Sequence, residues 1–135
     1  MRFTHELRVR YGECDPQGIV FNANYLAYFD IAVTELWREA IGPWQVMVER
    51  GVDVVVAEAN VSFRRPARFD DMIVLGARVG RFGTTSMTTE IDIRRDGELL
   101  VDGWLRQVFV DAKTWEKTEI PPWARDALGR FSEPA

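Results

Sequence analysis

The hydrophobic and polar positions of this chain alternate first with the period of a strand and then with the period of a helix. In residues 3–11 the odd positions are mostly apolar and the even positions are polar or charged, which predicts a half-buried strand. Across residues 25–40 apolar side chains recur every three or four positions, which predicts an amphipathic helix of about five turns. Gly42-Pro43 ends this helix, and Asn22 or Asn24 is the expected N-terminal cap.

The rest of the chain has mainly the pattern of strands. Apolar residues alternate with polar ones over residues 55–63, 73–79 and 85–93. Asp96-Gly97 is a strong two-residue hairpin signal, and it leads into a last long strand over residues 99–110. That strand is apolar on both faces in places, so we expect it in the interior of the sheet.

The end of the chain and the order of the elements define the fold class. Pro121-Pro122 predicts a short helix over residues 123–128, and we expect residues 129–135 to form a frayed tail. Without a repeat or linker, residues 1–135 read as one domain. A strand, a long helix and four antiparallel strands predict a two-layer α+β domain. One helix covers only part of a five-stranded sheet, so uncovered edges and leftover aromatic residues predict a homo-oligomer.

Composition narrows the function classes. The chain is 47% hydrophobic and 28% charged, which is ordinary for a globular domain. Its net charge of −4 argues against nucleic-acid binding. We expect no membrane span or signal segment, because no long apolar run occurs. One cysteine excludes an internal disulfide and fits a cytoplasmic protein, and one histidine makes a zinc site unfavourable. We expect neither metal nor cofactor.

Residues 11–25 carry the clearest chemical signal. Asp15 lies in a Pro/Gly turn between the first strand and the long helix. A carboxylate there can face the start of the helix, where free N–H groups favour developing negative charge. A base or nucleophile beside an oxyanion donor is the minimum equipment for acyl transfer. On local chemistry alone, the alternative is a turn residue or a helix cap.

This stretch resembles the signature of the 4-hydroxybenzoyl-CoA thioesterase family of hotdog-fold enzymes. The resemblance rests on an ordered set of residues, namely Tyr11, Glu13, Asp15, Gly18, Ile19, Val20, Asn24 and Tyr25. Shorter similarities follow in Gly-Pro-Trp at 42–44, Val-Glu-Arg-Gly at 48–51 and Phe-Asp-Asp at 69–71. Together they cover roughly residues 5–123.

The resemblance implies a fold and a mechanism. In the hotdog fold a five-stranded antiparallel sheet wraps around a long central helix, and the domains pair into homodimers or homotetramers with active sites at the dimer interface. By position, Asp15 would be the nucleophile or general base. The backbone N–H of Asn22 would polarise the thioester carbonyl. Many relatives have His at that position, but a backbone donor does not depend on the side chain.

The resemblance also implies substrate-binding positions. Asp30 and Trp44 match the acyl pocket, where an acidic residue can bind a phenolic hydroxyl, and Tyr25 opens the helix beside them. Relatives carry basic residues for the CoA phosphates in the loop that here reads Gly83, Thr84 and Thr85. This chain lacks them there, which leaves Arg81 or Arg64 and its neighbours as phosphate contacts.

The leading hypothesis is therefore an acyl-CoA thioesterase that favours aryl over fatty acyl groups. A hotdog dehydratase is disfavoured because it needs a histidine near the helix. Cys14 is disfavoured as a nucleophile because the only histidine, His5, lies at the far end of the strand. Three alternatives stay open: a thioesterase for acyl-carrier-protein substrates, a non-catalytic module that binds acyl thioesters or small ligands, and a purely structural oligomer.

Overall fold

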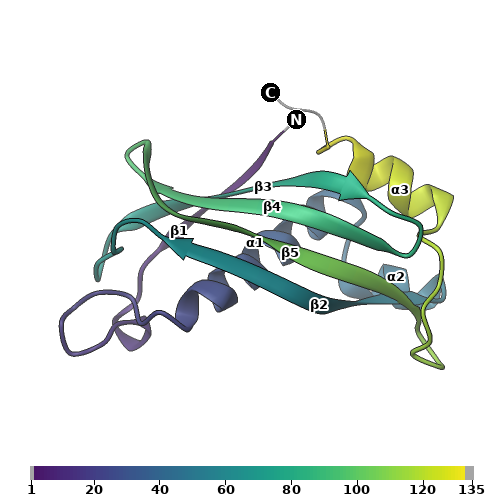
Figure 1. Ribbon diagram of the computed structural model, residues 1–135, viewed down its shortest axis with the longest axis horizontal. Helices are drawn as coiled ribbons and strands as arrows, with labels where there is room; N and C mark the ends of the chain where they lie inside the picture. The colour runs from purple at the N-terminus through teal and green to yellow at the C-terminus, as the bar shows by residue number, and fades with distance from the viewer. Residues whose placement is uncertain (1, 133–135) are drawn as a thin grey trace.

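The structure, a computed structural model that describes residues 2–132, contains one antiparallel sheet with a long helix across it (Figure 1). The strands lie in the order β1-β3-β4-β5-β2. The elements are β1 (Phe3–Arg8), the 3₁₀ helix η1 (Tyr11–Glu13), α1 (Asn24–Ala40), α2 (Trp44–Glu49), β2 (Val52–Phe63), β3 (Met72–Phe82), β4 (Ser86–Arg95), β5 (Glu98–Asp111) and α3 (Pro122–Gly129). The predicted two-layer α+β architecture is confirmed.

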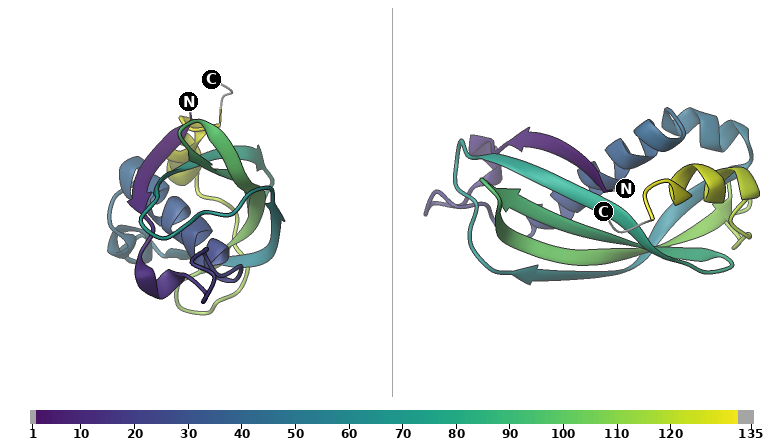
Figure 2. Two further views of the ribbon diagram at one scale, coloured as in Figure 1. Left: turned by 90° about the vertical axis from the view of Figure 1, so that its left-hand side faces the viewer. Right: turned by 90° about the horizontal axis from the view of Figure 1, so that it is seen from above.

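The sheet curves around α1 because its strands carry register breaks (Figure 2). Breaks occur between Val56 and Glu58 in β2 and between Val79 and Arg81 in β3. An extra residue of this kind bends a strand and increases its twist. The curved sheet surrounds α1, which packs against β1, β3 and β4.

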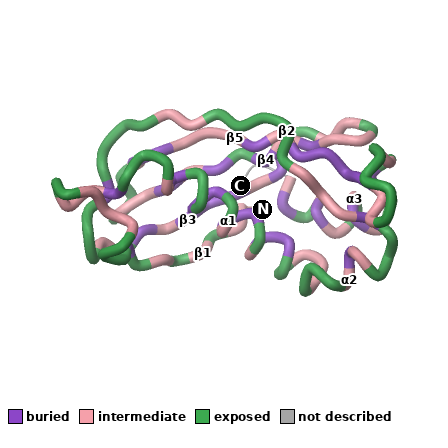
Figure 3. Tube along the Cα trace, turned by 90° about the horizontal axis from the view of Figure 1, so that it is seen from below, coloured by how far each residue is buried: buried purple, intermediate pink, exposed green. Residues whose placement is uncertain are grey.

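The core is formed by residues of α1 and of the sheet, and Figure 3 marks in purple the buried positions along the chain. Phe29, Ala32 and Leu36 of α1 are fully buried, which confirms the predicted apolar stripe. Fully burying a large apolar side chain such as Phe or Leu contributes about 1.5–3 kcal/mol. Gly103 lies where the helix crosses β5, and a Cβ there would be 1.9 Å from the Asn60 carbonyl oxygen and 3.0 Å from the Phe29 ring. Only glycine fits this crossing.

The predicted turns are confirmed. Asp96 and Gly97 both have positive φ, 51° and 81°, as the two-residue hairpin between β4 and β5 requires. Pro121 is the N-cap of α3 and is followed by proline at the first helical position. β5 pairs with β4 and β2, so it lies in the interior of the sheet as expected.

Two local predictions are wrong, and one helix was missed. β1 ends at Arg8, and Tyr11 starts η1 with its side chain 80% exposed, because Arg10 and Glu13 form a capping box there. The helix α2 was not predicted, since six residues are too short for a periodic pattern. Neither Asn22 nor Asn24 caps α1; its N-cap is Ala23, without a side-chain hydrogen bond.

The end of the chain and β2 also differ from expectation. Residues 129–132, expected to fray, are held: Phe131 is buried and its carbonyl accepts the Val79 N–H at 2.9 Å. Residues 133–135 lie outside the described part. β2 was expected to bury one face, but Val56–Asn60 in its middle is exposed throughout because it forms the sheet edge beyond α1. No helix within residues 2–132 is long and apolar enough to cross a membrane.

Candidate active site

The segment from Glu13 to Phe21 forms a tight hairpin that carries Asp15. The Phe21 N–H donates to the Glu13 carbonyl at 2.9 Å and closes its base. Within it, the Asp15 N–H donates to the Ile19 carbonyl and the Gly18 N–H to the Asp15 carbonyl, both at 2.9 Å. Gly18 has a φ of 80°, a left-handed conformation that glycine adopts without strain. The hairpin therefore fixes the backbone of Asp15 from both sides.

The Asp15 side chain is partly exposed, and one of its oxygens has a structural partner. Oδ1 accepts the Gln17 N–H at 2.8 Å. This is the turn role that the sequence left open as the alternative. Within residues 2–132 no donor contacts the second oxygen. One carboxylate can thus hold the turn and still present an oxygen to a substrate or a water molecule.

Asn22 lies at the end of the hairpin, two residues before α1 begins. The first N–H groups of the helix already have partners: Asn24 donates to the Phe21 carbonyl at 2.8 Å, and Tyr25 donates to the Asn22 carbonyl at 3.2 Å. The Asn22 N–H itself meets no acceptor in the described part of the chain. It is therefore available to bind a substrate oxygen at the positive end of the helix.

Glu13 connects the hairpin to α1. Its Oε1 accepts the Tyr28 hydroxyl and the Arg10 N–H, each at 2.8 Å, and its Oε2 accepts the Arg10 Nε at 3.0 Å. Its carbonyl also accepts the Asn24 side-chain amide at 2.8 Å. Burial alone would raise the pKa of Glu13, but the hydrogen bonds from Arg10 and Tyr28 outweigh it and hold the pKa below its ordinary value. Burial and then the Glu13 carboxylate raise the pKa of Tyr28, which keeps its hydroxyl a donor.

The hairpin rests against residues 66–71, the segment that precedes β3. The Val20 N–H donates to the Ala67 carbonyl at 2.9 Å, and the Phe69 N–H donates to the Gly18 carbonyl at 3.0 Å. The two segments thus form a small patch of antiparallel pairing beyond the main sheet. The position of the hairpin consequently depends on how firmly residues 66–71 are held.

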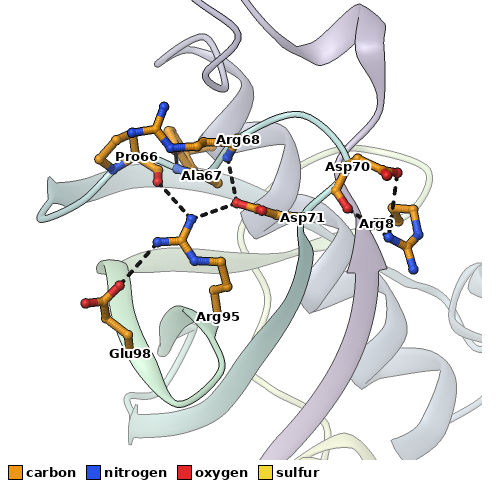
Figure 4. A network of polar contacts seen from close by, with 9 residues as sticks. Arg8, Pro66, Ala67, Arg68, Asp70, Asp71, Arg95 and Glu98 are labelled. Carbon is orange, nitrogen blue, oxygen red and sulfur yellow. Dashed lines mark hydrogen bonds and ion pairs between the residues drawn. The ribbon is translucent and has the colours of Figure 1, made fainter.

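Asp71 holds that supporting segment to β4 (Figure 4). Its Oδ2 accepts the Arg68 N–H at 2.8 Å and the Arg95 guanidinium at 2.7 Å. Arg95 also contacts the Pro66 carbonyl at 3.4 Å and Glu98 at 3.2 Å. Burial would raise the pKa of Asp71, but the Arg68 N–H and the Arg95 guanidinium outweigh it and hold the pKa below its usual range.

A cleft of about 250 Å³, here called the Asn22 cleft, opens beside the start of α1. Tyr25 lines it, and its buried hydroxyl accepts the Ala67 N–H at 3.1 Å, which ties α1 to the segment before β3. Arg64 also lines it and pairs with Asp102 at 3.1 Å. Asp15 belongs to the adjoining hairpin but not to the lining. The full lining is Ile19, Val20, Asn22, Tyr25, Phe63, Arg64, Arg65 and Pro66.

A second cavity, here called the Trp44 pocket, has a volume of about 340 Å³ and lies between α1, α2, β2 and β5. It brings together Asp30 and Trp44, the two residues expected to form an acyl pocket. The Trp44 indole N–H donates to Asp53 at 3.1 Å, while Asp30 is exposed and forms no ion pair within residues 2–132. The lining is Asp30, Val33, Thr34, Trp37, Arg38, Gly42, Trp44, Met47, Asp53, Val54, Val56 and Gln107.

The turn between β3 and β4 forms a third cavity with α3, here called the Thr84 cleft. The Thr85 carbonyl accepts the Phe109 N–H at 2.8 Å, which holds the turn in place. Arg125 of α3 donates to the Gly83 carbonyl at 2.7 Å and brings a cation that the sequence analysis missed. Arg81 lies in β3 just outside the cleft. The lining is Phe82, Gly83, Thr84, Glu119, Ile120, Pro122, Arg125 and Asp126.

The Asn22 cleft lies at one end of the chain, and the Trp44 pocket and the Thr84 cleft lie at the other. The Asn22 cleft includes Phe63 at the end of β2, and the Trp44 pocket includes Asp53 near its start. Ten residues of strand between them span about 33 Å. Figure 1 shows the η1–α1 loop at one end, and α2, α3 and the β3–β4 turn at the other. A single chain thus separates Asp15 from Asp30, Trp44 and the Gly83–Thr85 turn, whereas the predicted contacts Tyr25 and Arg64 lie at the same end as Asp15.

A hollow of about 570 Å³, larger than the Asn22 cleft and the Trp44 pocket, lies on the outer face of the sheet. It contains Arg64 but none of Asp15, Asn22 and Asp30. Its charged side chains largely pair with one another, as Arg78 does with Glu90 at 3.0 Å. Size alone therefore does not make it the chemical site.

The amino-acid sequence matches a known family over most of its length. A profile described as the thioesterase superfamily matches residues 17–101, more than half of the chain. The chain belongs to the thioesterase superfamily. This confirms the family resemblance and the prediction of an enzyme that hydrolyses thioesters.

Named relatives of this thioesterase agree with that assignment. Acyl-CoA thioester hydrolase YbgC of Escherichia coli O6:H1 is 28% identical over 120 residues, covering 88% of this chain and 90% of the relative. The 4-hydroxybenzoyl-CoA thioesterase of Pseudomonas sp. (strain CBS-3) is 36% identical over 75 residues, covering 53% of each chain. A thioesterase-superfamily structure from Jannaschia sp. CCS1 has a TM-score of 0.92 at 24% identity, covering 98% of this chain and 94% of its own. The structural likeness confirms the hotdog fold.

Proposed function

We propose that this thioesterase hydrolyses acyl-CoA, with Asp15 as nucleophile or general base and the Asn22 N–H as oxyanion donor. The observation that carries this proposal is that one carboxylate oxygen in the hairpin and the backbone N–H directly after it, in the loop before α1, lack protein partners in the described chain. Its relatives named as acyl-CoA thioester hydrolases support CoA as the carrier.

The chemistry needs few groups because a thiolate is a good leaving group. Asp15 either attacks the carbonyl carbon, giving an anhydride that water then opens, or takes a proton from the attacking water. In both routes the carbonyl oxygen gains negative charge, which the Asn22 N–H stabilises; one such donor contributes about 10²–10³ in rate. The products are a carboxylate and the free thiol, and no cofactor takes part.

The substrate site is proposed to lie between two copies of the chain. β2 is a sheet edge, and its exposed stretch Val56–Asn60 is centred on Glu58, which pairs with Arg106 at 2.9 Å. Two-fold antiparallel pairing at Glu58 would set Phe63 of one copy opposite Asp53 of the other, since each lies five residues away. The Asn22 cleft of one copy would then adjoin the Trp44 pocket of its partner. A further step to a homotetramer, and a cytoplasmic location, stay predictions from the sequence.

Within this shared site, the Trp44 pocket is proposed to hold an aryl acyl group. Its aromatic walls and the Asp30 carboxylate suit a flat ring with a polar substituent. The local identity to a 4-hydroxybenzoyl-CoA thioesterase supports the same preference. The CoA phosphates are assigned to the Thr84 cleft with its Gly83–Thr85 turn, where Arg125 and neighbouring Arg81 supply positive charge. Arg64 lies at the opposite end of the chain from the Thr84 cleft. Only the Arg64 of the partner copy would therefore contact a phosphate bound there.

Thiol release from aryl-, phenylacetyl- and fatty-acyl-CoA tests the proposal, with wild type beside Asp15→Asn. Asparagine can still accept the Gln17 N–H, so this variant removes the charge and keeps the turn. We expect kcat to fall by about 10²–10⁴. Asp111→Asn is the matched control, because Asp111 holds a similar turn through the Lys113 N–H at 2.8 Å. Equal kcat in Asp15→Asn and wild type contradicts the mechanism.

A further inference from the structure

The layer between the sheet and α1 is apolar, with two exceptions. Apart from aromatic residues that carry a hydroxyl or indole N–H, Thr89 of β4 and Gln107 of β5 are the only buried polar side chains within residues 2–132, at 0% and 3% exposure. The Thr89 hydroxyl donates to the Gln107 Oε1 at 2.8 Å. The Gln107 amide N–H groups, however, meet no acceptor in that part of the chain. The Gln107 amide nitrogen is not among the fully buried atoms, and Gln107 lines the Trp44 pocket, so these N–H groups are open to a molecule bound there.

A second unpartnered donor lies in the same place. Trp37 of α1 is 8% exposed, and its Nε1 is the one buried side-chain polar atom among the described residues that lacks a hydrogen-bond partner. Its ring packs on Phe109, with 5.6 Å between ring centroids. Trp37 and Gln107 both line the Trp44 pocket, together with the Asp30 carboxylate. The two residues whose donors lack protein partners, Gln107 and Trp37, therefore line the same cavity.

We propose that Gln107 determines specificity by donating hydrogen bonds to an oxygen on the acyl group. This inference rests on the proposed function and names its substrate class. A ring hydroxyl suits the pocket because it can accept from the Gln107 amide and donate to the Asp30 carboxylate. A hydrocarbon acyl group leaves these donors unpaired. Thr89 is a positioning residue, since it holds the Gln107 oxygen and thereby turns the amide nitrogen toward the cavity.

The test compares two CoA thioesters of similar size, 4-hydroxybenzoyl-CoA and 4-methylbenzoyl-CoA, by thiol release. For wild type we expect kcat/KM to favour the hydroxyl substrate by about 10²-fold or more, because buried donors reject an analogue that lacks the polar group. Gln107→Met should reduce this ratio at least about tenfold, mainly by losing the hydroxyl substrate. Thr89→Val should move it in the same direction. The control is Thr88→Val, the same change one position away, on the outer face of the sheet.

Equal kcat/KM for the two substrates in wild type, or an unchanged ratio in Gln107→Met, overturns the inference while leaving hydrolysis intact. If wild type releases no thiol from any acyl-CoA, the proposed function fails instead. Calorimetry with non-hydrolysable thioether analogues of the two substrates then decides the inference separately. The inference is supported if wild type binds the hydroxyl analogue more tightly than the methyl analogue and Gln107→Met removes this difference. Equal binding of the two analogues by wild type overturns it. If Gln107→Met does not fold, Thr89→Val carries the same comparison, since it keeps the glutamine.

Discussion

Replacing Tyr28 by phenylalanine tests the contact between α1 and the hairpin that carries Asp15. Tyr28 is 1% exposed, and its hydroxyl donates to Glu13 at 2.8 Å. Phenylalanine fills the same space apart from the oxygen, so one hydrogen bond is lost and almost no cavity forms. Hydrogen bonds to charged groups contribute about 1.5–3 kcal/mol. Glu13 keeps its contacts with Arg10, so we expect the free energy of unfolding to fall by about 1.5 kcal/mol, the lower limit.

The same substitution should lower catalysis more than binding. The Glu13 carbonyl closes the hairpin through the Phe21 N–H, so a looser Glu13 shifts Asp15 relative to Asn22. A displacement of about 1 Å can reduce a rate about 10²-fold. Because Arg10 and Asn24 still hold Glu13, we expect about a tenfold fall in kcat. KM should change less, because the acyl and CoA contacts assigned above come from other cavities.

Urea unfolding followed by circular dichroism gives the stability, and thiol release well below the unfolding transition gives kcat and KM. Tyr11→Phe is the matched control: Tyr11 is 80% exposed, and its hydroxyl has no partner within residues 2–132. We expect that control to stay within about 0.5 kcal/mol of wild type. An unchanged stability in Tyr28→Phe refutes the contact. A loss of stability with full kcat refutes the positioning role.

Two further predictions concern the ionisation of Glu13 and the shared site. The folded-state pKa of Glu13 lies below the ordinary value of 4.5, so its contribution to stability is complete above that pH and is lost as the pH falls through the folded pKa. As the pH is lowered, the free energy of unfolding should therefore fall less steeply for Glu13→Gln than for wild type. Identical curves of unfolding free energy against pH contradict this. Co-expressing Asp15→Asn with Trp44→Ala should recover about one quarter of wild-type activity, since half the dimers are mixed and each holds one intact site. No recovery refutes a site shared between two copies of the chain.

The features that sequence predicted well are those decided by local sterics or by a long period. Asp96-Gly97 and Pro121-Pro122 allow few backbone conformations, and each formed the predicted turn or helix start. The stripe on α1 covers several turns, so its burial could be read from residues 25–40 alone. The motif likewise placed Asp15 and Asn22 in one loop before the helix.

The missed features depend on contacts distant in sequence. Nothing near Asp71 indicates that Arg95, from another strand, would hold it. Arg125 reaches the Gly83 turn from a helix 42 residues further along the chain. Gln107 reads as an ordinary polar position in a strand, and only the packed sheet shows that it faces α1. The exposed middle of β2 contradicted the predicted alternation because alternation cannot tell an inner strand from an edge.

Val20 is the one residue of the hairpin around Asp15 that is buried in the apolar core, and the rest of the hairpin is held by hydrogen bonds and ion pairs. Glu13 ties it to the helix and Asp71 fixes the segment behind it, while Phe21 at its base is 55% exposed. Regions with few buried apolar contacts open at lower free energy than the core and do so as local units. Acid, which removes both carboxylate charges, should thus open the hairpin first. Activity would disappear while the sheet and α1 still protect their amides from hydrogen exchange.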